Sequence, residues 1–210
     1  MTPITTTGVS APQPTDAGER TWQKITAWLV CRRVRLTLAV FALLIVEDVL
    51  IGVKPHGIFA YRDPVAVTGC MIIFAGLGIR SWSAGLLRKN RELTTTGPYA
   101  LVRNPLYVGS FLIMCGFCTL IDDVENIYFV LGPIAGLYFL QVLHEERYMA
   151  KLFPAQWPEY ARTVPRFFPR AIPKAAFVPW DAHQWLGSRE YNALGATLLG
   201  MLAVELWRLS

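Results

Sequence analysis

The sequence predicts an all-α protein that crosses a membrane with about five helices. Of its 210 residues, 53% are hydrophobic and only 17% are charged, whereas an ordinary soluble domain carries about 25% charged residues. The apolar residues are also gathered into runs, and each run approaches the roughly 20 residues that a helix needs to cross a bilayer. Too little polar chain remains to cover these runs with a soluble shell. The five runs are residues 36–53, 65–87, 105–121, 127–143 and 191–207.

The charges inside these runs are few. The first run holds two acids, Glu47 and Asp48, and no small-residue cleavage pattern follows it, so it is not a signal peptide. The second run holds Arg80, and the third and fourth hold no charge. The last run contains Asn192 and Glu205. These polar residues leave open whether residues 191–207 cross the membrane completely.

The chain divides into a tail and one membrane domain. Residues 1–19 are rich in Thr, Pro and Ala, and we expect them to be disordered. Residues 20–210 form a single domain in this interpretation. At its start, Trp22, Ile25 and Trp28 recur at helical spacing among basic residues, as in a helix that lies at the membrane surface. A plain basic flank would give a similar pattern.

The basic residues predict the orientation. The net charge is +5, which alone would suit nucleic acid or an anionic membrane. Sixteen of the 20 Lys and Arg side chains precede the first run or lie between the second and third or the fourth and fifth runs. The positive-inside rule therefore places the N-terminus and both long polar loops in the cytoplasm. Because the membrane explains these charges, we expect no nucleic-acid partner, and we expect any chemistry on the cytoplasmic face.

Several motifs are better explained by packing than by chemistry. Cys115 and Cys118 form a CxxC inside an apolar run with no nearby His or carboxylate, so we expect no metal site. The start of a dinucleotide fingerprint at Gly76 has Ser81 where its third glycine should be. Gly132 and Gly136, four residues apart, permit close helix contact.

One polar segment before the third run has the form of a ligand site. Gly97-Pro98 predicts a turn. Pro105 suits the first position of a helix, with Asn104 as its N-cap. Backbone N–H groups at such a helix start carry partial positive charge and suit a carboxylate. A cap followed by a span, with a snorkelling Arg103 beside it, explains the same residues without a ligand.

A second segment lies at the end of the fourth run. Glu145 and Glu146 are adjacent near a helix C-terminus, where they repel each other and oppose the helix dipole. A cationic ligand would account for them. A solvated helix end balanced by Arg147 and Lys151 would account for them as well.

Taken together, these segments resemble a known family. The pattern G-P-Y-x2-V-R-N-P-x-Y-x-G begins at Gly97, E-E-x5-L-F begins at Glu145, and Y-x3-V-P begins at Tyr160. Their order and spacing are similar to those of the isoprenylcysteine carboxyl methyltransferase and phospholipid methyltransferase family. The resemblance covers about residues 86–170.

The resemblance implies an integral membrane enzyme that uses S-adenosylmethionine. The cofactor carries a sulfonium, an ammonium and a carboxylate, to which acids, a helix start and aromatic faces are suited. By resemblance, the residues expected to bind it are Leu93, Thr94, Tyr99, Asn104, Pro105, Leu106, Tyr107, Glu145 and Glu146.

The sequence departs from the family in three places. Asn104 stands where the common motif has His, and an amide cannot ionise, so a proton-transfer role there is unsupported. Thr163 stands where prenylcysteine enzymes have Arg, which weakens prenylcysteine as the substrate. Arg162 and Arg166 lie nearby and are candidates for orienting an acceptor. Residues 171–210, including the fifth run, extend beyond the resemblance.

The sequence therefore predicts methyl transfer to a lipophilic carboxylate, amine or thiol at the cytoplasmic face of a membrane, with membrane lipids as partners. A bacterial inner membrane suits the short outer loops. No general base stands out, so no catalytic residue is assigned. Two alternatives stay open: an NADPH-dependent reductase of the sterol-reductase type, and a non-catalytic membrane scaffold. The acceptor and the oligomeric state are not determined by the sequence.

Overall fold

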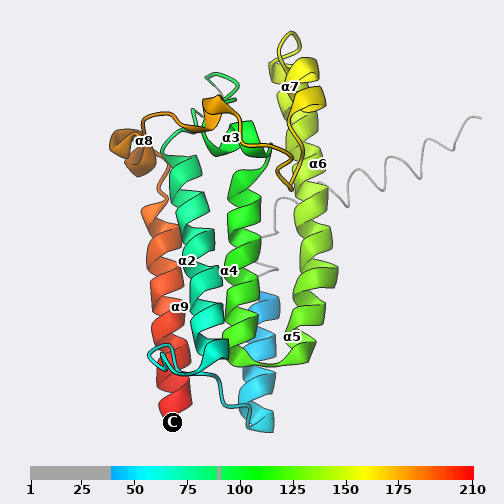
Figure 1. Cartoon of the computed structure of the whole chain (residues 1–210). Coiled ribbons are helices and arrows are strands. Elements are labelled where there is room, and N and C mark those ends of the chain that lie inside the picture. Colours follow the sequence, from blue (N-terminus) through cyan, green and yellow to red (C-terminus); the bar gives the residue numbers. More distant parts are fainter. Residues whose placement is uncertain (1–38, 89–90) are drawn as a thin grey trace, which may run out of the picture.

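The computed structural model describes residues 39–88 and 91–210. Every regular element in these ranges is helical, which confirms the all-α prediction. The long helices stand side by side as a bundle, and the short ones gather at one end of it (Figure 1). The predicted tail, residues 1–19, and the predicted surface helix after it lie outside the described residues.

The long helices coincide with the five apolar runs. The first run is represented by a helical segment over residues 39–51. The second and third correspond to α2 (Pro64–Ala84) and α4 (Pro105–Ile121). The fourth lies within a continuous helical stretch made of α5 (Val124–Phe129), the π-helical η1 (Val130–Ile134) and α6 (Ala135–Leu152). The fifth corresponds to α9 (Tyr191–Leu209).

Within residues 39–88 and 91–210, two helical stretches are long and apolar enough to cross a membrane, fewer than the five predicted for the whole chain. They are Pro64–Ala84 and Glu125–Leu152, with Pro105–Ile121 as a shorter apolar helix. Only 28% and 22% of the residues in their most apolar windows are buried inside the protein, unlike the core helices of a soluble domain. Large side chains such as Met71 and Leu131 are exposed. These surfaces indicate association with a membrane.

Four glycines let α2 and α4 pack backbone to backbone. A Cβ added to Gly76 would lie 2.6 Å from the carbonyl oxygen of Gly109, and one added to Gly116 would lie 2.8 Å from that of Gly69. The two pairs recur seven residues apart along each helix, so they mark one continuous line of contact. Close approach of this kind is typical of membrane helices with small residues at the interface.

The expectation that Gly132 and Gly136 mediate close packing is wrong for the part of the chain that the structure describes. No described atom lies within 4 Å of a Cβ added at either position. Pro133 lies between them inside η1. Proline lacks a backbone N–H and cannot complete the regular helical ladder, which accounts for the local π-helical geometry.

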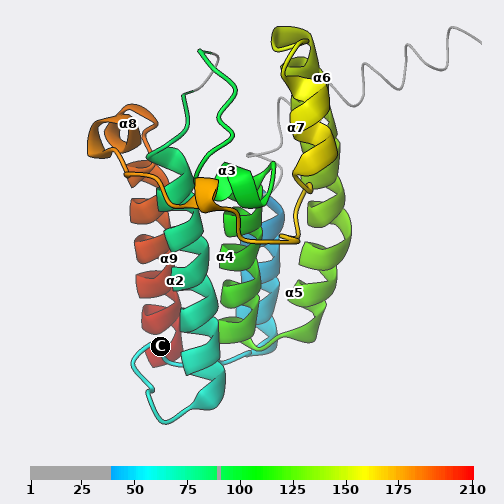
Figure 2. The same ribbon diagram turned by 45° about the horizontal axis from the view of Figure 1, so that its top comes forward.

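Short elements build the end of the bundle that holds the polar loops. These are α3 (Pro98–Leu101), α7 (Trp157–Thr163), the 3-10 turn η2 (Lys174–Ala176) and α8 (Ala182–Gly187). After α7 the chain crosses over α3 (Figure 2). The N–H of Arg103 donates to the carbonyl of Pro165, and the N–H of Gly97 donates to that of Ala175, both at 2.8 Å. The crossing segment is therefore fastened to the loops beneath it.

At the opposite end of the bundle, His56 links the residue before α2 to the residue after α4. Its Nδ1 is bonded to Asp63, and its Nε2 lies 3.2 Å from Asp122. Asp63 caps α2 by accepting from the N–H of Val65, and Asp122 ends α4 in the left-handed conformation. Burial alone would lower the pKa of His56, but the hydrogen bonds and charges of the two aspartates outweigh burial and raise it.

Candidate functional site

A cavity of about 540 Å³ opens at the loop-rich end of the bundle, between α2, α4, α6 and the segment before α3. All nine residues expected to bind the cofactor line it: Leu93, Thr94, Tyr99, Asn104, Pro105, Leu106, Tyr107, Glu145 and Glu146. They come from four separate parts of the chain. The fold therefore brings the predicted set together around one space.

The start of α4 forms one wall of this cavity. Pro105 occupies the first helical turn, as predicted, and Asn104 is the residue before it. Asn104 is the N-cap residue of α4, as predicted, but within the described chain its side chain makes no capping bond. Its Nδ2 instead donates to Oε1 of Glu146 at 3.0 Å. This charge-assisted bond orients the Asn104 amide.

Glu146 is a buried carboxylate surrounded by donors. Arg166 Nη2 lies 2.8 Å from Oε2, and Arg103 Nε lies 3.6 Å from Oε1, in addition to the bond from Asn104. The hydrogen bond to Glu146 raises the pKa of Arg166. Because these contacts satisfy the carboxylate and balance its charge, Glu146 holds the polar wall together.

Glu145 lies on the same wall but has different neighbours. Its Oε1 accepts from the hydroxyl of Tyr107 at 2.6 Å and from Nε2 of Gln141 at 2.7 Å, and both donors are neutral. The Tyr107 ring packs edge-on against Tyr138, with centroids 5.6 Å apart. A carboxylate has about four acceptor positions, and Glu145 presents its charge at the cavity lining.

Tyr99 offers the cavity a buried hydroxyl. The side chain is buried, and its Oη has no hydrogen-bond partner among the described residues. Tyr160 donates to the Tyr99 backbone carbonyl at 2.8 Å and so fixes this segment. Burial raises the pKa of Tyr99, which keeps its hydroxyl protonated. An unpaired buried hydroxyl that lines a cavity is suited to a polar ligand group.

These features fit S-adenosylmethionine. The volume lies within the range of about 300–1,000 Å³ typical of small-molecule sites. The lining combines the Glu145 carboxylate for positive groups, the N-terminus of α4 for a carboxylate and aromatic faces for the adenine or the sulfonium. Tyr99 adds an available hydroxyl. The residues present therefore match the chemical groups of the cofactor.

Other lining residues were not predicted from the sequence as ligand contacts. They include Arg80, Arg103, Ser110, Tyr138, Tyr148, Met149, Trp157 and Tyr160. Arg103 stacks over the Trp157 ring at 5.9 Å from its centroid. The charge of Arg80 inside an apolar run was a usable signal, because ionisable groups in membrane helices are commonly functional. Tyr138 gave no such signal, since an aromatic residue in an apolar run is ordinary.

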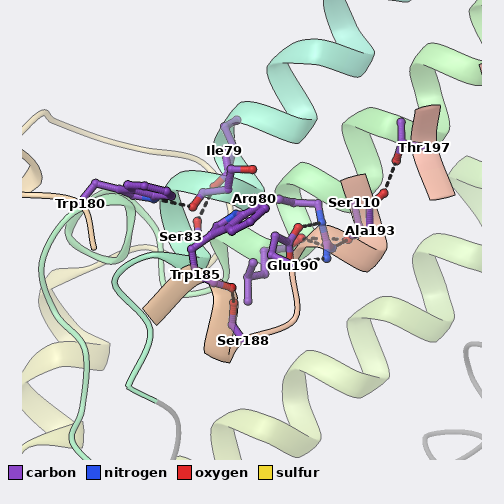
Figure 3. A network of polar contacts seen from close by, with 12 residues as sticks. Ile79, Arg80, Ser83, Ser110, Trp180, Trp185, Ser188, Glu190, Ala193 and Thr197 are labelled. Atoms are coloured by element: carbon purple, nitrogen blue, oxygen red, sulfur yellow. Dashed lines mark hydrogen bonds and ion pairs between the residues drawn. The ribbon is translucent and has the colours of Figure 1, made fainter. Parts of the chain in front are cut away.

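Arg80, which lines the cavity, is the centre of a polar network (Figure 3). Its Nε and Nη2 bind the two carboxylate oxygens of Glu190 at 2.7 and 3.0 Å, and its Nη1 donates to the Ser110 hydroxyl. This is a two-point arginine–carboxylate pair, the geometry that gives such pairs both strength and orientation.

The two arginines proposed to orient an acceptor are placed differently. Arg162 is largely exposed and pairs with Glu159 one turn earlier, and it does not line the cavity. Arg166 binds Glu146 and lies over the Phe139 ring, 5.8 Å from its centroid. Any effect of Arg166 on a ligand therefore acts through Glu146.

Three acids meet at the other end of the bundle. One carboxylate oxygen from each of Glu47, Asp48 and Asp123 lies within 4.8 Å of the other two. Asp48 is buried and accepts a hydrogen bond from Asn126 at 2.8 Å. This acidic group is separate from the cavity, and the expectation that the protein holds no metal stays a prediction.

Part of the chain is similar to known proteins. Residues 65–156 match the profile of the phospholipid methyltransferase family. The cobalt-zinc-cadmium resistance protein CzcN of Cupriavidus metallidurans is 35% identical over 106 residues, covering 50% of this chain and 49% of that protein. The nickel-cobalt-cadmium resistance protein NccN of Alcaligenes xylosoxydans xylosoxydans is 29% identical over 116 residues, covering 51% and 54%. The chain thus spans about half the length of these relatives. No solved structure matches it.

Proposed function

We infer that this chain, whose residues 65–156 belong to the phospholipid methyltransferase family, is a membrane methyltransferase that takes its methyl group from S-adenosylmethionine. One observation carries the inference. Nine residues chosen by resemblance, spread from Leu93 to Glu146, line a single cavity of suitable size. Seven of them lie between Leu93 and Tyr107, and the fold adds Glu145 and Glu146 from a distant part of the chain to the same space.

Different lining residues bind different groups of the cofactor. When bound, S-adenosylmethionine supplies a methyl group already activated by the sulfonium. Glu145 attracts the positive groups, and Tyr107 orients Glu145 through its hydrogen bond. The positive end of the α4 dipole favours the carboxylate, although the N–H groups of Tyr107 and Val108 there already donate to the Asn104 carbonyl. Glu146 takes no direct part in this proposal; it fixes Asn104 and thereby the entrance of α4.

The remaining task of the protein is to align the acceptor and keep water out. The walls around Tyr138, Leu106 and Met149 supply an apolar surface for that purpose. A carboxylate acceptor would react without a base, whereas an amine or thiol would first lose a proton. We assign no catalytic residue.

We propose that the acceptor is lipophilic and enters from the bilayer between the helices. The exposed apolar surfaces of α2 and α6 support a lipid environment around the bundle. In this proposal all five long helices cross a bacterial inner membrane. The N-terminus and the cavity lie on the cytoplasmic side, in accord with the basic residues of the loops.

The test is isothermal titration of the purified protein, in detergent and in lipid nanodiscs, with S-adenosylmethionine and with its demethylated product. We expect binding by the parent protein and a loss of at least tenfold in affinity in Glu145→Gln, about the value of one charge-assisted hydrogen bond. Arg170→Ala is the matched control, because Arg170 is exposed and lines a different groove. Failure of the parent protein to bind either compound would overturn the proposal.

The same preparation separates the two alternatives. A reductase would bind NADPH, and a scaffold would bind neither NADPH nor the methyl donor. Feeding labelled methionine to cells with and without the protein, followed by mass spectrometry of lipids and small metabolites, would identify the acceptor class.

The names of the two relatives favour a physiological setting for the reaction. Both are called resistance proteins for cobalt and cadmium, together with zinc or nickel. We propose that the methylation performed here contributes to growth under excess of such metals. A deletion strain complemented with the parent chain should grow at metal concentrations at which complementation with Glu145→Gln fails. Equal growth of the two strains would argue against this role.

A further inference from the structure

The Arg80–Glu190 pair joins the cavity to the last helix. Arg80 belongs to α2, lines the cavity and keeps 20% of its side chain exposed there. Glu190 lies directly before α9, is buried, and accepts from the Nε and Nη2 edge of the guanidinium with both carboxylate oxygens. Figure 3 shows the two side chains directed toward each other, with Ser110 on the far side of the arginine. The pair is 110 positions apart in the sequence.

Contacts of the preceding residues hold Glu190 in place. Ahead of it, the Trp180 ring nitrogen donates to the Ser81 carbonyl at 2.9 Å, and the Gln184 amide donates to the Leu87 carbonyl. Arg189 takes a left-handed backbone conformation with φ 58°, which turns the chain into α9. The segment before Glu190 is thus fastened to the end of α2, the helix that carries Arg80.

The charge balance of the cavity depends on this pair. Three arginines line the cavity, and two of them have a carboxylate partner that also lines it: Arg88 with Glu92 at 3.2 Å, and Arg103 with Glu146 at 3.6 Å. The partner of Arg80 is Glu190, which lies outside the lining and outside the family-matching residues 65–156. Without Glu190, one more positive charge would face a ligand that is itself a cation.

We propose that Glu190 is a positioning residue of the methyl-donor site: it fixes Arg80 in the cavity wall and balances its charge, so that the C-terminal helix completes the site. This inference rests on the proposed function. S-adenosylmethionine carries one positive charge more than its demethylated product, and a charge placed in the cavity wall acts on that difference. A loss of shape alone would weaken both ligands alike.

The experiment compares the affinities of the two ligands by calorimetry in three variants. In Glu190→Gln, Arg80 loses its counter-charge while the side chain keeps its size. We expect the affinity for S-adenosylmethionine to fall about fivefold more than that for the product. In Arg80→Gln/Glu190→Gln both charges are gone, and the ratio of the two affinities should return to within about twofold of the parent value. Glu159→Gln, which removes an exposed acid paired with Arg162, is the control and should leave the ratio unchanged.

Each outcome decides between two statements. If the two affinities fall equally in Glu190→Gln, or if the double variant does not restore their ratio, the positioning role is wrong and the methyltransferase proposal stands. If the parent protein binds neither ligand, both proposals fail. Should Glu190→Gln not fold, Glu190→Asp keeps the charge, and its ratio should equal that of the parent protein; a shifted ratio would count against the inference.

Discussion

Asn104 reaches across from the start of α4 to Glu146 on α6 and donates its amide N–H to that carboxylate. The two residues are 42 positions apart, and the bond joins two helices that both line the cavity. At the position where related enzymes are expected to carry His, the Asn104 side chain therefore links α4 to α6 through a hydrogen bond.

The hydrogen bond from Asn104 to Glu146 predicts which substitutions at position 104 the protein tolerates. Asn104→His keeps an N–H donor for Glu146, so ligand affinity and thermal stability should remain close to those of the parent. Asn104→Asp places a second carboxylate against Glu146 and should lower stability by about 1–3 kcal/mol. Differential scanning fluorimetry in detergent measures the effect. Equal melting temperatures for the two variants would contradict the role.

Arg166 is predicted to be a stability residue. Its removal takes the closest cation from the buried Glu146 and leaves Arg103 at 3.6 Å, so Arg166→Ala should destabilise the fold by about 1–3 kcal/mol. Arg162→Ala is matched in chemistry but breaks an exposed, solvent-screened pair, so it should leave the stability nearly unchanged. Denaturant unfolding of both variants checks the contrast.

Tyr107 should affect ligand binding more than stability. Tyr107→Phe keeps the ring that packs against Tyr138 but removes the hydroxyl that holds Glu145. One lost hydrogen bond corresponds to about a fivefold loss of affinity. Calorimetry with the demethylated product measures it. A variant with parental affinity would show that the orientation of Glu145 is irrelevant.

The α2–α4 contact should be intolerant of even one methyl group. Gly76→Ala places a Cβ 2.6 Å from a backbone carbonyl oxygen that cannot move aside, and overpacking of this kind costs about 1–3 kcal/mol. Gly136→Ala in α6 meets no described atom within 4 Å and should be neutral or stabilising, because alanine favours helices. Thermal unfolding of the pair provides the test.

The loop at the far end of the bundle gives the stability a pH dependence. The folded-state pKa of His56 is raised by Asp63 and Asp122. A raised pKa means that the protonated imidazole stabilises the fold, fully below the ordinary pKa of about 6.5. This contribution is lost as the pH rises through the higher folded-state value. Melting temperatures measured from pH 6 to 9 should fall for the parent protein and fall less for His56→Gln.

The positions of the helices could largely be predicted from the sequence. The run 105–121 coincides with α4, because Pro105 suits a helix start and the charged Asp122 follows the last apolar residue. The fourth run was placed correctly but is too short, since the helix continues through polar residues to Leu152. Helical spacing in an amphipathic end segment gives a weaker signal than an unbroken apolar run.

The partners of the site residues could not be predicted in the same way. Composition shows that Arg80 needs a counter-charge, but 15 acids are available in the chain, and only the fold selects Glu190. Likewise, Gly76 and Gly109 form the helix contact while Gly132 does not. Which glycine faces a neighbour depends on helix rotation, and a single sequence contains little information about rotation.

The Arg80–Glu190 pair also has a consequence for the order in which the protein is made. An arginine in an apolar helix costs about 2.5–3.5 kcal/mol on entering the bilayer centre, and α2 emerges from the ribosome long before Glu190. Until α9 arrives, Arg80 must be accommodated near the end of α2 by water or lipid headgroups. Once α9 has been synthesised, Glu190 pairs with Arg80 and replaces the water or headgroups around its charge. Chains released before α9 should be the ones that quality-control proteases recognise, because Arg80 then lacks the carboxylate that pairs with it in the finished protein.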